Sequence, residues 1–187
     1  MEMHAAAFDI PAVGPSAYLT LAGITLLAAV LPMLVARQRS LAANLRSGAA
    51  VGAMVLPVTL LLGLGLSKNT LEVRDGQVQV RASYFYEYAR DIGEFDLAQA
   101  RQGSLASIDA ARLGPRDNGI SLPGYAAGRF TSADQRPLFV AVTDRERVVY
   151  LPAKQGQSLL VSVEQADQLL ALLHGRAAAQ RQLALHP

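Results

Sequence analysis

Two uncharged apolar stretches constrain this chain most: residues 16–36 and 47–67 each run for 21 residues without an Asp, Glu, Lys or Arg. Each stretch contains nine Leu, Ile or Val residues, and only ten residues separate the two. A helix rises about 1.5 Å per residue, so each stretch would be about 31 Å long, close to the roughly 30 Å hydrocarbon core of a bilayer. The sequence therefore predicts an integral membrane protein with two spanning helices and the lipid bilayer as a partner.

The short connection between the two stretches predicts how the helices are arranged. Helices joined by so few residues run antiparallel and contact each other. Gly48 and Gly52 are four residues apart and would let two helix backbones approach closely. This pair faces either the first helix, near Ala22 and Gly23, or a second copy of the chain, and the sequence leaves both arrangements open.

The distribution of Arg residues predicts the orientation in the membrane. The connection contains Arg37, Arg39 and Arg46, whereas the sixteen residues before Ala17 contain no Lys or Arg. Short loops rich in Lys and Arg stay in the cytoplasm, so we expect both chain ends on the extracytoplasmic side. The lack of a basic segment before the first stretch argues against a cleaved signal peptide. We therefore expect the first helix to remain as an anchor.

The rest of the chain is long enough for one further domain. We expect an N-terminal tail (1–15), the transmembrane hairpin (16–67), a domain (68–175), and a helix end with a tail (176–187). From residue 68 onward the chain has 14 Lys and Arg against 13 Asp and Glu, so no basic face for nucleic acid is expected.

Residues that carry chemistry are scarce in this sequence. There is no Cys, which excludes disulfides, thiolate metal sites and a cysteine nucleophile. The three His residues, His4, His174 and His186, are scattered, whereas zinc takes three or four protein ligands. No catalytic motif is found. We therefore expect no metal, no cofactor and no enzymatic activity.

The domain begins with a β-hairpin. Asp75-Gly76 is the dipeptide that a two-residue turn requires, and residues 71–74 and 77–80 alternate apolar and polar. With this turn, Val73 lies opposite Val78, and all the apolar side chains share one face. Six further short strands are predicted, which favours a small antiparallel barrel or sandwich. They are 84–89, a segment around Ile108, 128–131, 138–143, 148–151 and 158–161, with 143–146 as a hairpin loop between two of them.

The last element of the domain has a helical period. Val163, Ala166 and Leu170 are spaced by three and four residues, as are Leu173 and Ala177. Ser162 and Gln165 form the pattern of a capping box, which predicts a helix start there. One amphipathic helix would then cover a face or an end of the sheet.

Several motifs in this order resemble the bacterial PH-domain (pleckstrin-homology-like) family of membrane-tethered proteins. They are Leu122-Pro123-Gly124-Tyr125, Gly128-Arg129-Phe130, Leu138-Phe139-Val140, Thr143-Asp144-Arg145 and residues 147–152. The resemblance implies an α+β membrane protein: a two-helix anchor, then a PH-like antiparallel β-barrel or sandwich over residues 68–175 with a C-terminal capping helix. It also implies the bacterial plasma membrane. That family is described by its fold and not by a chemical activity. Where such domains carry a Gly-rich or aromatic segment, this chain has residues 116–119, which we expect to be a loop.

Two groups of residues are candidate contacts for a ligand or partner. Tyr84, Tyr86 and Tyr88 would line one face of one strand, where they pack in the core, lie at the membrane interface or bind a partner. Tyr125 and Arg129 would place an aromatic face beside a guanidinium, which suits an anionic or peptide group.

We therefore expect a membrane-anchored, non-enzymatic binding or assembly module, for a protein partner or for self-association. A phosphoinositide is disfavoured because no cluster of Lys and Arg is present. One alternative is an accessory subunit of a larger membrane complex. Another is a membrane enzyme with an unrecognised site between the tyrosines and Arg129.

Overall fold

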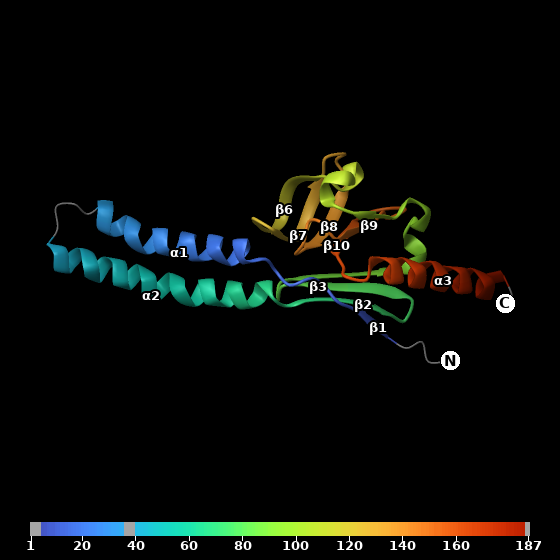
Figure 1. Cartoon of the computed structure of the whole chain (residues 1–187), viewed down its shortest axis with the longest axis horizontal. Coiled ribbons are helices and arrows are strands. Elements are labelled where there is room, and N and C mark those ends of the chain that lie inside the picture. The colour runs from blue at the N-terminus through green and yellow to red at the C-terminus, as the bar shows by residue number, and fades with distance from the viewer. Residues whose placement is uncertain (1–4, 36–39, 186–187) are drawn as a thin grey trace.

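A computed structural model describes residues 5–35 and 40–185 (Figure 1). An antiparallel pair of helices forms one end of the elongated molecule, two β-sheets form the middle, and a third helix forms the other end. The predicted α+β combination of two apolar helices, β-structure and a C-terminal helix is confirmed. His4, Arg37, Arg39 and His186 lie outside the described residues.

The two apolar helices are α1 (Pro15–Val35) and α2 (Leu41–Leu66). Both are long and apolar enough to cross a membrane, with mean hydropathies of 1.5 over Pro15–Pro32 and 2.2 over Arg46–Leu66. The hydroxyl oxygens of Thr25 and Thr59 are 2.7 Å apart and form a hydrogen bond between the helices. A Cβ added at Gly52 would lie 3.9 Å from the Cβ of Ala29, so this glycine faces α1. Gly48 is buried.

The first sheet has the order β1-β2-β3-β4, and all its neighbours are antiparallel. The predicted hairpin between β2 and β3 is confirmed, because Val73 pairs with Val78 and Leu71 with Val80. Asp75 and Gly76 have φ values of 52° and 77°, as a turn of this length requires. The strands are β1 (Ala6–Phe8), β2 (Asn69–Arg74), β3 (Gln77–Ala82) and β4 (Tyr86–Asp91).

Strand β1 lies in the segment that the sequence suggested was a tail. Ala6 pairs with Val73 and Phe8 with Leu71, because the helical hairpin returns the chain to the place where it left the sheet. The carbonyl of Asp9 also accepts a hydrogen bond of 3.0 Å from the backbone N–H of Glu164. The segment before α1 is therefore part of the domain.

The second sheet has the order β5-β9-β10-β8-β7-β6. The expectation was an antiparallel barrel or sandwich. The two sheets do not close into a barrel, and the second sheet is mixed because β8 and β10 are parallel. The connection from β8 to β9 crosses over the position of β10, because β10 lies between these two strands in the sheet. The strands are β5 (Arg101–Gly103), β6 (Leu113–Leu122), β7 (Tyr125–Ser132), β8 (Pro137–Val142), β9 (Val148–Leu151) and β10 (Ser158–Ser162).

Ser162 has a different role from the predicted helix cap. It ends β10, and its hydroxyl accepts hydrogen bonds of 3.1 Å from the N–H groups of Thr143 and Asp144 and donates to the Asp144 carbonyl at 2.7 Å. These bonds hold the connection between β8 and β9, which is not a hairpin loop because those strands are not neighbours. Helix α3 (Ala166–Leu185) begins four residues later.

Two other local predictions were wrong. Residues 116–119 lie in β6, not in a loop, and the pairing of β6 with β7 contains register shifts between Leu113 and Asn118. An edge strand can accept Pro115 within such an irregular stretch. The segment around Ile108 forms short 3₁₀ turns, Leu105–Ser107 and Asp109–Ala111, instead of a strand.

The central strands of the second sheet, β8, β9 and β10, are buried on both faces. One face packs against the first sheet and α3, where Phe139, Leu159 and Leu173 are fully buried. The opposite face is covered by the segment that carries Ile108 and Ala111. This explains why every residue of β9 and β10 is buried.

Candidate functional site

The end of α2 meets the domain at Asn69. Its side-chain nitrogen donates to the Leu66 carbonyl at 2.6 Å, and its side-chain oxygen accepts from the Ser83 N–H at 3.2 Å. The same oxygen accepts from the Tyr125 hydroxyl at 3.4 Å. On the other helix, the Ser16 hydroxyl donates to the Pro123 carbonyl at 3.0 Å. Both helices are thus bonded to the domain at their domain ends.

The structure separates the candidate pair on β7. Tyr125 is fully buried, and burial raises the pKa of its hydroxyl well above the usual value for a tyrosine. Arg129 is exposed on the same strand, opposite Phe139 of β8. Tyr86 lies over this strand, since a Cβ added at Gly128 would be 3.1 Å from its ring. The φ of 115° at Gly128 is one that only glycine adopts readily.

The three tyrosines near β4 have three different environments. Tyr88 is buried, its ring centre is 5.1 Å from that of Phe139, and its hydroxyl donates to the Gln157 carbonyl at 2.9 Å. Desolvation raises the pKa of this hydroxyl well above the usual value. Tyr86 is half-buried, and Tyr84 is exposed in the turn before β4. The three tyrosines therefore do not form the expected row on one face: Tyr88 is in the core, Tyr86 is half-buried and Tyr84 is exposed.

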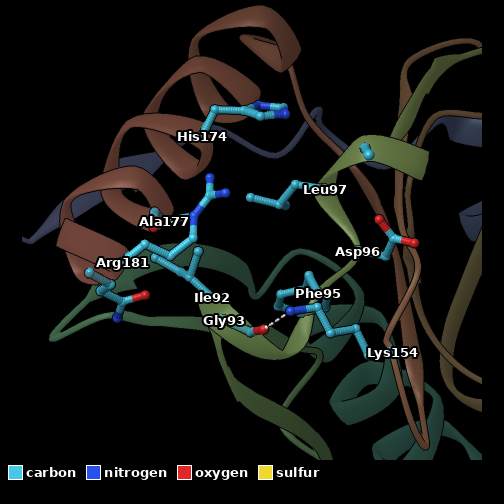
Figure 2. A pocket seen from close by; sticks show the side chains of 11 residues that line it. Ile92, Gly93, Phe95, Asp96, Leu97, Lys154, His174, Ala177 and Arg181 are labelled. Carbon is cyan, nitrogen blue, oxygen red and sulfur yellow. Dashed lines mark hydrogen bonds between the residues drawn. The ribbon is translucent and has the colours of Figure 1, made fainter. Parts of the chain in front are cut away.

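A cleft of about 470 Å³ lies between α3 and the segment that follows β4 (Figure 2). Its floor is apolar and includes Ile92 and Phe95, both of which are buried. The side chains of His174 and Arg181 project from α3 toward Leu97. Neither the predicted tyrosines nor Arg129 line this cleft. The lining residues are Ile92, Gly93, Phe95, Asp96, Leu97, Ala98, Lys154, His174, Ala177, Gln180 and Arg181.

The rim of the cleft carries more positive than negative charge. Lys154 donates to the Gly93 carbonyl at 2.7 Å, and the Nε of Arg181 donates to the Ala177 carbonyl at 3.2 Å. The Nδ1 of His174 is 2.7 Å from the Leu170 carbonyl, which leaves Nε2 for another partner. The carboxylate of Asp96 accepts from Gln99 at 2.7 Å. Such a rim above an apolar floor suits an acidic group attached to an apolar one.

Sequence reasoning missed the cleft because three distant segments build it. One signal was present: His174, Ala177 and Arg181 are spaced by three and four residues and so share one face of a helix. Within residues 5–35 and 40–185, no three His, Asp or Glu side chains are grouped so that they could hold a metal ion.

A second hollow of about 700 Å³ runs along the groove between α1 and α2. Thr25 and Thr59 lie in it, Gly63 forms part of its wall, and Tyr18 and Ser67 lie at its domain end. The other lining residues are apolar: Leu21, Ala22, Leu26, Ala29, Leu56, Leu60 and Leu64.

Comparison of the chain with protein-family models, with curated proteins and with solved structures finds no match.

Proposed function

We propose that this protein is a membrane-anchored, non-enzymatic binding or assembly module, in which the α1–α2 hairpin spans the bilayer and the domain built from the two sheets and α3 engages a protein partner. The observation that carries the proposal is the position of exposed large apolar side chains. Of fifteen such side chains among the described residues, seven lie on α1 and six on α2. A surface of this kind is covered by lipid or by other apolar helices.

A soluble core helix and a cleaved signal sequence are also long and apolar, but α1 and α2 fit both less well. A core helix of a soluble protein would be mostly buried, whereas only 6% and 11% of the two spanning windows are buried. A cleaved signal sequence would take β1 with it, although β1 is hydrogen-bonded to β2 and packs on the core through Phe8. Both facts support a retained anchor.

Cysteine labelling tests the anchor and its orientation, because the natural chain contains no Cys. Single Cys residues replace Ala7 in β1, Ser40 between the helices and Gln135 in the domain. In intact bacterial cells, a membrane-impermeant maleimide is expected to label Ala7→Cys and Gln135→Cys. Ser40→Cys is expected to react only after permeabilisation, because in the orientation that we propose the connection between the helices is cytoplasmic.

Each alternative has its own labelling pattern. If only Ser40→Cys reacts in intact cells, the hairpin spans the membrane in the opposite orientation. If all three positions react to the same extent on the same side, the hairpin does not span. Full-length protein that stays in the supernatant after ultracentrifugation without detergent would overturn the membrane assignment itself.

The cleft beneath α3 is the binding site that the geometry supports best. Helix α3, which provides one wall of the cleft, lies at the end of the molecule opposite the hairpin (Figure 1), so a spanning hairpin leaves the cleft open to a partner in solution. Two cations on its rim, Lys154 and Arg181, outnumber the one carboxylate, Asp96, which favours an acidic segment with an apolar side chain. We propose such a segment of a protein as the ligand.

Site-specific photo-crosslinking tests this site in cells. A photoreactive amino acid at Ala98, on the exposed rim of the cleft, is expected to give a discrete protein adduct that Arg181→Glu abolishes. The same amino acid at Ala110, which is exposed on the other side of the second sheet, is the control. Equal adducts from both positions, or adducts that persist in Arg181→Glu, would contradict the assignment.

A role as an accessory subunit is the second candidate, and the hollow between α1 and α2 favours it. A Cβ added at Gly63 meets nothing within 4 Å, so Gly63→Phe would fill this space without disturbing the hairpin. If another membrane protein packs there, it will co-purify with the natural chain in mild detergent and be lost from Gly63→Phe. Leu61→Phe, at an exposed position outside the hollow, is the matched control.

A further inference from the structure

Two exposed aromatic rings stand apart from the hairpin surface. Tyr84 and Phe85 are 57% and 53% exposed, and in the described part of the chain they are the large exposed apolar residues that lie outside α1 and α2. They occupy the turn between β3 and β4. Every other large exposed apolar side chain in those ranges is on the surface that we assign to lipid.

This turn packs against the last turn of α2. A Cβ added at Gly65 would lie 2.8 Å from the Ser83 hydroxyl and 3.4 Å from the Tyr84 ring. The ring of Phe85 would be 3.9 Å from the same point. The two aromatic rings are therefore continuous with the apolar surface of the hairpin, at the level where α2 enters the domain.

The position of the turn is fixed. Asn69 accepts from the Ser83 N–H and donates to the Leu66 carbonyl, so one side chain joins the turn to the end of α2. Ser83 itself has a φ of 61°, and Phe85 contacts Tyr86 edge to face with ring centres 6.4 Å apart. These contacts hold the turn in place, so the rings of Tyr84 and Phe85 stay exposed in the folded protein.

We propose that the Tyr84–Phe85 turn enters the interfacial region of the same bilayer that holds the hairpin. This inference rests on the proposed membrane anchor. Tyrosine favours the level of the lipid head groups because its ring is apolar and its hydroxyl is polar. Two side chains are far fewer than the 20–30 residues, or about 800 Å², that each partner contributes to a stable protein interface. The domain would thus contact the membrane at three points and have a defined tilt.

Tryptophan fluorescence tests the proposal directly, because the chain contains no Trp. Phe85→Trp is reconstituted at full length in phosphatidylcholine vesicles that carry a spin label either near the head group or near the middle of the acyl chain. We expect a blue-shifted emission that the shallow label quenches more strongly than the deep label. Tyr84→Trp is the second variant and is expected to behave in the same way.

Two matched variants separate the failure of this inference from the failure of the anchor. Leu27→Trp, exposed near the middle of α1, should be quenched most by the deep label, and His174→Trp, exposed on α3, by neither. If Phe85→Trp and Tyr84→Trp are no more quenched than His174→Trp while Leu27→Trp is quenched, the interfacial turn is wrong and the anchor remains. If Leu27→Trp is not quenched, both fail. Stronger quenching of Phe85→Trp by the deep label would also overturn the assignment.

Discussion

Asn69 bonds three segments at once: the end of α2, the turn at Ser83 and the buried hydroxyl of Tyr125. An amide side chain can do this because it both donates and accepts. Nothing in the sequence around Asn69 distinguishes it from an ordinary residue at the start of a strand. Its importance comes from positions 83 and 125, which only the folded chain brings near.

We expect Asn69→Ala to lower the free energy of unfolding by about 1–3 kcal/mol, because it leaves partly buried donors and acceptors without partners. The measurement is urea unfolding of the full chain in a mild detergent, followed by tyrosine fluorescence. Asn118→Ala, at an exposed position in β6, is the control and is expected to change the unfolding free energy little. An equal loss in both variants would show that the three bonds have no special role.

Asp144 predicts how the stability of the fold depends on pH. Hydrogen bonds from the Glu146 N–H at 2.9 Å and the Arg147 Nε at 2.8 Å lower the pKa of its carboxyl group. A pKa lower in the folded than in the unfolded state stabilises the fold above the unfolded value, about 3.9, and this stabilisation is lost as the pH falls through the folded value. Asp144→Asn should therefore be less stable than the natural chain at neutral pH, with a difference that shrinks below about pH 4.

The difference is measured by unfolding both proteins across this pH range. Asp134→Asn, an exposed carboxyl in the turn between β7 and β8, is the matched control. A stability difference that is constant with pH would mean that the substitution acts through shape and not through charge.

At the scale of elements, the helical hairpin shows what a periodic sequence can and cannot predict. The two helices and their antiparallel contact follow from length and hydropathy alone. The facing residues do not: Gly52 was expected near Ala22 or Gly23, or against a second copy, and it lies against Ala29. In the bilayer that we propose for this hairpin, lipid provides no hydrophobic drive that would select one face of an apolar helix, so small residues and hydroxyl pairs decide which face is in contact.

We expect Thr25→Cys with Thr59→Cys to form a disulfide on mild oxidation, because the two hydroxyl oxygens are 2.7 Å apart. Adding Gly52→Leu should reduce this disulfide severalfold by pushing α1 away, whereas Ala53→Leu, on the exposed side of α2, should not. The control pair is Leu27→Cys with Leu61→Cys. Each of these residues follows the corresponding Thr by two positions, so its exposed side chain points away from the other helix. The electrophoretic mobility on a non-reducing gel, compared with the reduced sample, measures the disulfide in all four proteins. Equal cross-linking of both Cys pairs would contradict the helix register.

At the scale of the whole molecule, the sequence predicted the turns and strands that depend on neighbouring residues, but not the contacts between distant segments. The hairpin at Asp75-Gly76 and the strand Val148–Leu151 were predicted correctly, because turn chemistry and short apolar runs are properties of neighbouring residues. The pairing of β1 with β2 and the parallel contact of β8 with β10 join distant segments, which alternation alone does not specify. The cleft beneath α3 escaped prediction for the same reason.

Strand β1 gives the prediction at this scale. Phe8→Ala should lower the free energy of unfolding by about 1–3 kcal/mol, since the ring packs on the main core and leaves a space when it is removed. Ala7→Ser, on the exposed side of the same strand, is expected to have little effect. Thermal unfolding of the full chain in detergent compares them, and an unchanged midpoint for Phe8→Ala would show that β1 contributes nothing to the domain.

The pairing of β1 with β2 also orders events during synthesis. Translation produces β1 before either apolar helix and β2 only after both, so β1 stays without its partner while the hairpin forms. If one helix alone inserts in the bilayer, the two strands end on opposite sides of it and the first sheet lacks its edge. In a chain whose hairpin spans the bilayer, as we propose, completion of that sheet therefore excludes the insertion of one helix alone.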